Sequence, residues 1–510
     1  MTPTIRGRWR NGKRHIERRL DKTKLPPNHQ PQFAASNIHY DLGERCRGLA
    51  YGGLGAIQLM VQQLGLPEAI DQRLHVLKFH RPYHESDHVL NLAYNALCDG
   101  TCLQDLELRR NDAVYLDALG ARRIPDPTTA GDFCRRFDKS AIRALLDAIN
   151  DTRLKVWAQQ PSAFFAEAIL DADGSLVETT GQCKQGMDIA YNGTWGYHPA
   201  VVTLANTAEV LSLLNRSGNR PSHEGAAAEI DYALDVCFRG GFRRALLRGD
   251  TDFSQTQHLD RWHDSGRVRF LFGYDAQLNL KNHAAERAES AWKRLRRPPR
   301  YVVKTEPRQR PANVKEQIVR EREFKNLQLQ AEHVAEFDYR PTVCRHTYRL
   351  IVVRKDILTT QGQQVLFDEC RYRYSFYITN DQTTPADELV FLANERCNQE
   401  NLLAQLKALR ALHAPVDTLL SNWAYMVMTA LAWNLKAWFA LCLPETPGPH
   451  RVTYQTDKRW VLGLEFRTFV NTFIKLPCQL VRAGRRLLFR LLSWTPFQPI
   501  LFRLVGVLGH

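Results

Sequence analysis

The residues with the clearest chemical potential lie in the stretch 396–407, where Arg396, Glu400 and Lys407 are spaced as on one face of a helix. At about 100° per residue they fall at roughly 0°, 40° and 20° around the axis, within one narrow stripe. The far side, at roughly 220° to 280°, is apolar and predicts a core-facing surface made by Leu402, Leu406 and Leu409. A carboxylate flanked by two cations suits a group that holds a metal beside a phosphate; a salt-bridged surface helix is the alternative.

Acidic residues also follow two predicted strands. An apolar run that ends in a Gly-Ser turn contains Asp171 and Asp173. These two face the same side of a strand, so periodicity does not choose between them. A later apolar run leads into Asp250 and Asp252. Asp250 ends its strand, whereas Asp252 begins the next turn and can cap the following helix.

The order of the predicted elements brings distant acids together. Strands are predicted at 168–175, 198–205, 210–214 and 244–248, with helices at 224–238 and from about residue 254. If the first three strands form a meander and the helix returns a parallel fourth strand beside the first, the tips of strands one and four meet. Asp173 and Asp250 would then lie side by side.

Such a pair of carboxylates predicts a metal site. Two carboxylates at close range repel each other unless a divalent cation neutralises them. Oxygen ligands with open positions select Mg²⁺ or Mn²⁺, which keep water and bind phosphate oxygens. A third acid from a helix laid against the sheet, for which Glu400 is the candidate, would complete a site for two metal ions and in-line attack on a phosphodiester.

Three segments together are similar to a known family. They are Leu170-Asp171-Ala172-Asp173-Gly174-Ser175, Arg248-Gly249-Asp250-Thr251-Asp252-Phe253 and the stretch with Arg396, Glu400 and Lys407. The chain resembles bacterial insertion-sequence transposases of the DDE type, which have a ribonuclease-H-like catalytic core. The last segment fits the signature Tyr-x2-Arg-x3-Glu-x6-Lys, except that Ala393 stands at the tyrosine position. Gly196-Tyr197-His198-Pro199 is similar to the second-strand signature of one branch.

The resemblance implies a role for each of these residues. Asp173, Asp250 and Glu400 would be the catalytic metal ligands. Asp173 is preferred over its neighbour two residues earlier because family members place the acid directly before a small residue and a Ser or Thr. Arg396 and Lys407 would bind phosphates that flank the scissile bond. An intrahelical ion pair of each cation with Glu400 is the alternative.

The resemblance also implies a function. A transposase of this type binds the inverted-repeat ends of its element, hydrolyses the 3′ phosphodiester and uses the freed 3′-OH to attack target DNA, with two Mg²⁺ or Mn²⁺ ions. Its partners would be double-stranded DNA, as transposon ends and as target, and a second subunit in a synaptic homodimer. The alternatives are a ribonuclease-H-like nuclease without strand transfer, a non-catalytic DNA-binding derivative, and a protein-interaction module whose acids are surface charge.

The charge of the chain favours a polyanionic partner. Its 510 residues include 69 Lys and Arg against 54 Asp and Glu, which gives a formal net charge of +15. The cations cluster in the ranges 6–24, 293–325 and 466–510. Three such runs favour nucleic acid over a membrane surface.

Two further features bear on the compartment. The apolar stretch 423–443 includes Asn434 and Lys436, which would be costly in lipid, so it predicts a buried helix and no membrane association. The eleven cysteines show no metal-ligand pattern and predict reduced thiols. We therefore expect a cytoplasmic, nucleoid-associated bacterial protein.

The elements predict an α/β protein with a ribonuclease-H-like mixed sheet flanked by helices, a helical N-terminal domain, and a β-rich insertion before the last catalytic helix. The expected parts are a basic arm and helical DNA-binding domain (1–160), the first part of the catalytic core (161–266), the insertion (267–388), the second part of the core with the Glu400 helix (389–445), and a basic C-terminal segment (446–510). Residues 1 to about 45 are expected to form a mobile arm.

Other DNA contacts are expected outside the acidic cluster. Arg135 and Arg136 lie on a predicted short helix at 130–137, compatible with a helix-turn-helix unit or with ordinary helical packing. By resemblance, the insertion can hold an unstacked base on an aromatic ring. Trp292 has suitable basic neighbours and Trp262 is a competitor, although packing can explain either ring. Strands of the insertion are predicted at 267–274, 301–304, 346–354 and 364–379.

Overall fold

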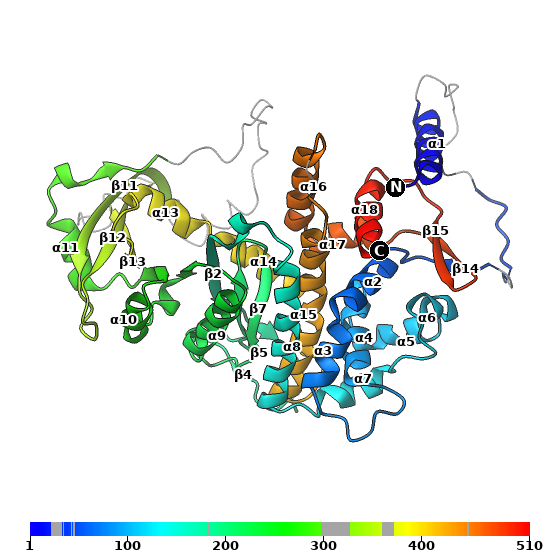
Figure 1. Cartoon of the computed structure of the whole chain (residues 1–510). Helices are drawn as coiled ribbons and strands as arrows, with labels where there is room; N and C mark the ends of the chain where they lie inside the picture. The colour runs from blue at the N-terminus through cyan, green and yellow to red at the C-terminus, as the bar shows by residue number, and fades with distance from the viewer. Residues whose placement is uncertain are drawn as a thin grey trace.

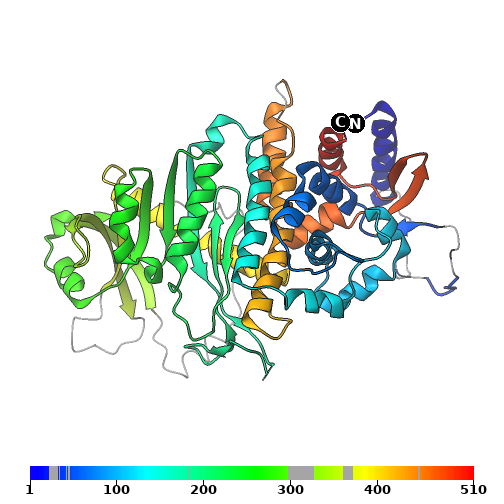
Figure 2. The same ribbon diagram turned by 60° about the horizontal axis from the view of Figure 1, so that its bottom comes forward.

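The computed structural model describes residues 1–21, 33, 35–41, 43, 46–181, 183–296, 327–359, 372–445 and 448–509. A wide mixed sheet with flanking helices forms one end of the molecule, and a cluster of helices with both chain termini forms the other (Figure 1). One long helix, α15 (Leu419–Leu441), runs between the two (Figure 2). The chain is thus an α/β protein with a large mixed sheet flanked by helices, as predicted.

In the described ranges the large sheet has nine strands, in the order β10-β11-β12-β13-β9-β8-β2-β6-β7. Their bounds, in that order, are Lys293–Arg294, Leu327–Tyr339, Tyr348–Thr359, Tyr372–Thr379, Val268–Tyr274, Arg244–Gly249, Glu167–Gly174, Ala200–Leu204 and Glu209–Leu214. β2 pairs with β8 in parallel and with β6 antiparallel, and β8 pairs with β9 in parallel. The predicted return of a parallel strand beside the first is confirmed.

The central strands are apolar on both faces because helices cover both. On β8, Leu246 packs with Leu389 and Val390 of α13 (Ala386–Asn394). The next residue, Leu247, belongs to a larger core to which the helices α9 (Ala226–Arg239) and α10 (Thr256–Asp264) contribute. Successive side chains on a strand point to opposite faces, so a strand covered on both sides has a nearly continuous apolar run.

The strands of the predicted insertion extend this same sheet. β13 pairs antiparallel with β9, and β11, β12 and β13 form an antiparallel meander. The predicted strands at 346–354 and 364–379 correspond to β12 and β13, while 301–304 and residues 364–371 lie outside the described residues. β9 falls within the range expected for the insertion, yet it is bonded directly to β8. Insertion and core therefore share one hydrogen-bonded sheet.

Residues 54–157 form a series of helices, in agreement with the sequence pattern. We call this region the helical half of the molecule. Its helices are α2 (Leu54–Leu64), α3 (Leu66–Arg73), α4 (Glu85–Leu97), α5 (Leu106–Arg110), α6 (Ala113–Leu119), α7 (Pro127–Cys134) and α8 (Lys139–Trp157). α4 is capped by His84 and Asp87. Ser86 lies in the first turn of this helix, and its hydroxyl donates to Asp71 over 2.9 Å.

The apolar stretch predicted as a buried helix is α15, and nearly all of its side chains are buried. It packs on α4, α7 and α8 of the helical half and on β7 of the sheet. In the part of the chain that the structure describes, no helix is long and apolar enough to cross a membrane. Because other elements cover α15 on all sides, apolar side chains can occupy every face of the helix.

Within the range expected to be a mobile arm, residues Pro3–Leu20 form the helix α1. The indole nitrogen of Trp9 donates to the carbonyl of Thr495 over 3.2 Å, and the rings of Trp9 and Trp494 lie 5.9 Å apart. The C-terminal segment contains α16 (Arg451–Gly463), α17 (Phe466–Phe469), β14 (Cys478–Ala483), β15 (Arg486–Leu491) and α18 (Gln498–Leu508). β1 (Gly48–Leu49) pairs with β14, so the two ends of the chain meet.

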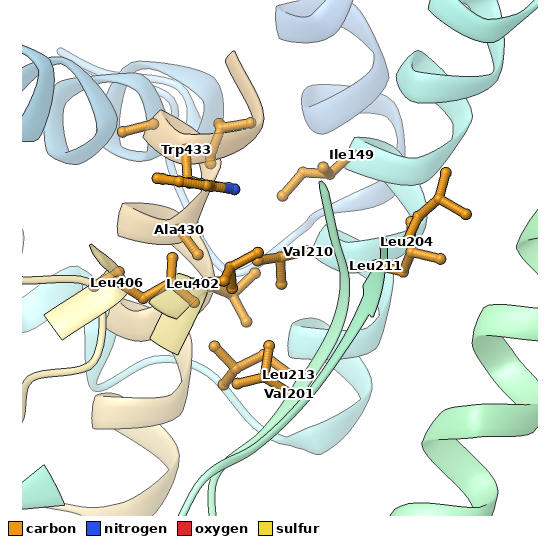
Figure 3. Packing of buried hydrophobic residues seen from close by; sticks show 14 of the residues in the cluster. Ile149, Val201, Leu204, Val210, Leu211, Leu213, Leu402, Leu406, Ala430 and Trp433 are labelled. Carbon is orange, nitrogen blue, oxygen red and sulfur yellow. The ribbon is translucent and has the colours of Figure 1, made fainter. Parts of the chain in front are cut away.

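The helix predicted to carry the third acid is α14 (Cys397–Ala408). Its leucine face is buried as expected, and Figure 3 shows Leu402 and Leu406 beside Val201, Val210, Leu213 and Ala430. Gln399 fixes the helix to β6, because its side chain accepts a hydrogen bond from Thr203 Oγ1 over 2.6 Å and donates to the carbonyl of Val201 over 3.3 Å.

Smaller elements complete the fold. A three-stranded sheet contains β3 (Val177–Glu178), β5 (Trp195–Tyr197) and β4 (Asp188–Ile189), in that order. The helix α11 (Leu278–Ala285) follows β9. The cysteines of the described residues are free thiols, as predicted.

Candidate active site

Asp171 and Asp173 both lie on β2 but have different surroundings. Asp171 is buried, and its two carboxylate oxygens accept hydrogen bonds from Arg248 of β8 over 2.7 and 2.8 Å. Arg248 also donates to the carbonyl of Leu392 over 2.9 Å and to Glu395 over 3.2 Å. Asp171 is thus fully engaged in a buried ion pair that joins β2, β8 and α13.

Asp173 is the next residue on the same side of β2 and lies at the strand end. Its Oδ1 accepts a hydrogen bond from the backbone N–H of Gly174 over 2.8 Å, and its Oδ2 lies 3.1 Å from Nη1 of Arg396. Its side chain is 13% exposed, which leaves it reachable from the sheet edge. Of the two aspartates on this strand, Asp173 is the one available to an external ligand.

Asp250 follows β8 directly, and because β8 runs parallel to β2 it lies at the same sheet edge as Asp173. Its Oδ1 accepts the backbone N–H of Asp252 over 3.0 Å and so caps the 3-10 turn Thr251–Phe253. Asp252 is exposed and does not cap the next helix, which begins after Gln255. The expected capping role of Asp252 is therefore wrong.

Arg396 and Glu400 come from the first turn of α14. Nη2 of Arg396 lies 3.9 Å from Oε1 of Glu400, so the guanidinium is between Glu400 and Asp173 and closer to the aspartate. The side chain of Arg396 is 18% exposed and that of Glu400 is 65% exposed. The helix stripe predicted from sequence thus faces the acids of the sheet edge.

The three acids influence one another electrostatically. The pKa of Asp173 is raised to about 6, mainly by burial; Arg396 lowers this pKa, while Asp250 and Glu400 contribute to the rise. Burial also raises the pKa of Asp250, with a contribution from Asp252, and Arg396 again opposes the shift. Negative charge is therefore concentrated here, and a further cation would stabilise the ionised acids.

The donor set is one that hard cations prefer, since it consists of carboxylates without thiol or imidazole groups. Within the described ranges, no three His, Cys, Asp or Glu side chains are grouped closely enough to enclose a metal ion on their own. The guanidinium of Arg396 instead lies between Asp173 and Glu400, and Arg396 also lowers the pKa of Asp250. The residues fit a divalent ion by their chemistry, with Arg396 supplying positive charge among them.

His198 lies against Gly174, the residue that follows Asp173, and the sequence pattern assigned it no role. It lies in the Gly-Tyr-His-Pro segment before β6, is 7% exposed, and its Nδ1 lies 3.0 Å from the carbonyl of Arg220, to which it can donate. Its Nε2 points at Gly174, where an added Cβ would come within 2.7 Å. Burial lowers the pKa of His198, and Asp252 and Lys407 act on it in opposite directions. The only sequence signal was the tetrapeptide itself.

The other predicted DNA-binding residues lie away from the acids or are packed. Arg135 ends α7 and pairs with Asp132 over 2.7 Å and with Asp417 over 2.9 Å. Arg136 is exposed. Lys407 lies on α14, beyond Glu400, and lines a cavity next to it.

Both candidate tryptophans are packed inside the protein. Trp292 is 8% exposed and has the guanidinium of Arg354 4.4 Å from its ring centre, with Arg354 held by Glu289. Trp262 is 3% exposed and donates to Asp231 over 2.9 Å. The structure therefore presents neither ring as an open stacking surface.

Comparison with known proteins identifies the family. Curated proteins give no match. Among solved structures, the chain is similar to one described as "Cryo-EM structure of piggyBac transposase synaptic complex with hairpin DNA", with 9% identity, coverage of 84% of this chain and 83% of that chain, and a TM-score of 0.35. The family model of the transposase DDE domain group 1 matches residues 49–510. Because that match spans nearly the whole chain, including every acid of the site, the protein belongs to the family of DDE transposases.

Proposed function

We propose that the protein binds the ends of its own mobile element, cleaves the 3′ phosphodiester and transfers the strand to target DNA. The observation that supports this proposal is that Arg396 lies beside both Asp173 and Glu400 and that Asp250 adds to the rise in the pKa of Asp173, with the three acids coming from segments 77 and 150 residues apart in sequence. The membership of the chain in the family of DDE transposases supports this proposal.

We further propose that the sheet is a ribonuclease-H-like core. The part β7-β6-β2-β8-β9 has three antiparallel strands followed by two that run parallel to β2. The acids would then come from the central strand, from the strand beside it and from a helix laid on the sheet. β10–β13 would be an addition on the free edge of β9.

Asp173, Asp250 and Glu400 would hold two Mg²⁺ or Mn²⁺ ions. When bound, such ions would activate the attacking oxygen and stabilise the leaving oxygen of a phosphodiester. Arg396 neutralises part of the charge of Asp173 and keeps further N–H groups that can donate to a phosphate oxygen. Asp171 and Arg248 would keep β2 and β8 in register without entering the chemistry.

The partners would be double-stranded DNA and a second copy of the chain, in the cytoplasm of a bacterium. The formal net charge of +15 supports a polyanionic ligand. A synaptic homodimer is proposed because two element ends must be joined. Arg135 and Arg136 would contribute at the helical half, with Arg136 the more available of the two because its neighbour is already paired.

The test is cleavage and strand transfer on a plasmid that carries the coding sequence with its natural flanking DNA, in the presence of Mn²⁺. Asp250→Asn and Glu400→Gln should abolish both reactions, because each removes a metal-binding carboxylate. The matched controls are Asp235→Asn on α9 and Glu388→Gln on α13, which change exposed acids outside the cluster and should retain activity.

Two outcomes would count against the proposal. If Asp250→Asn and Glu400→Gln cut as well as the parent, the acidic cluster is not the active site. If the parent releases cut ends but never joins them to a target plasmid, the protein is a nuclease without strand transfer.

A further inference from the structure

A cavity of 820 Å³ opens beside the C-terminal half of α14. One wall is the segment 176–181, which follows the strand of Asp173, and the other is the segment 410–415, which follows α14. Lys407, on the same helix stripe as Arg396 and Glu400, lies at its edge. The cavity therefore lies along the helix that carries Glu400, beside the segment that follows the strand of Asp173.

The walls carry mostly positive charge. Lys184, Lys407, Arg410 and His413 line the cavity, and Glu178 is the only carboxylate among the described residues that do so. Lys184 donates through Nζ to the carbonyl of Ala414, which ties the two walls together. Such a concentration of cations with one acid suits a ligand with several negative charges.

Partial burial changes the pKa of three side chains that line the cavity. Burial lowers the pKa of Lys407, and it lowers that of Lys184, against which Asp417 acts. Burial also lowers the pKa of His413, and the cations Arg410 and Lys184 lower it further. An anion in the cavity would be attracted by Lys184, Lys407 and Arg410, and His413, whose pKa is lowered, could donate a hydrogen bond to it as a neutral imidazole.

Arg410 occupies an unusual backbone position. Its φ is +63°, and it follows the end of α14, where its N–H donates to the carbonyl of Lys407 over 3.0 Å. The N–H of Ala411 donates to the carbonyl of Leu406 over 2.9 Å, which completes a helix-ending turn. Glycine is the usual residue at this position because a side chain there strains the backbone. A strained arginine beside an active site points to a use for its side chain.

We propose that this cavity binds the phosphates of the DNA strand that leaves the acidic cluster toward Lys407. Lys407 lies seven residues beyond Glu400, roughly 10 Å along the helix and thus about three nucleotides from the scissile phosphate, at about 3.4 Å per step. Lys184, Arg410 and His413 would contact the next phosphates. The inference rests on the proposed function, since it takes the acids as the cleavage site.

The test compares the parent with Arg410→Gly and with Arg410→Gly/His413→Gln. The probe is a fluorescent duplex of about 20 base pairs, and its Kd is measured from about 50 to about 200 mM salt. Loss of one phosphate contact should lower the slope of log Kd against log salt by about one and weaken binding roughly tenfold. The double variant should lose more.

Arg410→Gly separates binding from folding, because glycine adopts the observed φ without strain. Its melting temperature should equal or exceed that of the parent while its DNA affinity falls. The matched control is Arg244→Glu, an exposed arginine at the opposite end of β8 from Asp250, which should leave the slope unchanged.

The inference is overturned if both cavity variants keep the affinity and salt slope of the parent, or if Arg244→Glu changes them equally. These results differ from a failure of the proposed function. Glu400→Gln tests cleavage: if this variant still cuts DNA, the proposed catalytic site is wrong, whatever affinity the cavity variants have. If Glu400→Gln is inactive but Arg410→Gly binds DNA with the salt dependence of the parent, only the proposal for the cavity is wrong.

Discussion

At the scale of single residues, the two aspartates of β2 show how environment separates chemically identical groups. Asp171 is buried in an ion pair with Arg248, whereas Asp173 has a raised pKa at the edge of the sheet. The first stabilises the fold while ionised. The second is held ionised at neutral pH at the expense of stability, which is typical of residues kept for function.

Stability should therefore depend on pH through Asp173. Its pKa is about 6 in the folded chain and about 3.9 in the unfolded chain, so between these values the folded state binds the extra proton. The stabilisation by this group is full below about pH 4 and is lost as pH rises through about 6, a difference of about 3 kcal/mol. In metal-free buffer, Asp173→Asn should lack this loss and be more stable than the parent at neutral pH.

Urea unfolding of both proteins at several pH values measures the effect. Asp171→Asn is the matched contrast, because it leaves the buried Arg248 without a full countercharge and should destabilise the protein by about 3 to 5 kcal/mol. Equal stability of the parent and Asp173→Asn across the whole pH range would show that burial does not perturb this carboxyl.

At the scale of elements, one buried carboxylate holds α8, β7 and α15 together. Glu209 accepts hydrogen bonds from Arg153 over 2.9 Å, from the indoles of Trp157 and Trp438 over 2.9 and 2.8 Å, and from Thr207 over 2.6 Å. Glu209 and Arg153 are both completely buried. This network joins the helical half to the sheet at the helix that separates them in Figure 2.

Glu209→Gln should lower the free energy of unfolding by about 3 to 5 kcal/mol, because it leaves the cation of Arg153 buried without its countercharge. Chemical unfolding measures the loss. The control is Glu224→Gln, which removes a solvent-exposed ion pair with Arg220 and should cost at most about 1 kcal/mol. Similar losses for the two variants would contradict a special role of the buried network.

At the scale of the whole molecule, the continuous sheet makes the region between β9 and α13 part of the fold. β13 covers the edge of β9, with Phe376 in register with Tyr274. The N-terminal helix α1 differs, because it has no buried residues and is held mainly through Trp9. The two segments should therefore respond differently to removal.

Replacing residues 276–383 by a short Gly-Ser linker should expose the edge of β9 and cause aggregation, because an unpaired strand edge is a template for intermolecular pairing. Removal of residues 1–21 should leave a monodisperse protein whose stability changes by less than about 1 kcal/mol. Size-exclusion chromatography and thermal unfolding distinguish an aggregated product of the first deletion from a monodisperse product of the second. A soluble, cooperatively folding product from the first deletion would show that the core sheet ends at β9.

Much of the core was predictable because its signals are local. Alternating or continuous apolar runs located β2, β6, β7 and β8, and the helical stripe located the face of Glu400. The pairing of β8 beside β2 followed from the preferred geometry of strand-helix-strand connections. The helix α1 was missed because its apolar stripe is narrow, with Ile5, Trp9 and Ile16 among mostly polar residues, and because the partner of Trp9 lies at the other end of the chain.

The sequence by itself determined most elements of the core and that acids stand at the ends of β2 and β8. Only the tertiary structure decided the partners of Asp171 and Asp173, which share a strand face: Arg248 pairs with the first and Arg396 with the second. The same holds for His198 and Arg410, whose neighbours come from distant segments. Periodicity describes a residue's place on its own element, whereas its chemistry depends on the partners that folding brings from others.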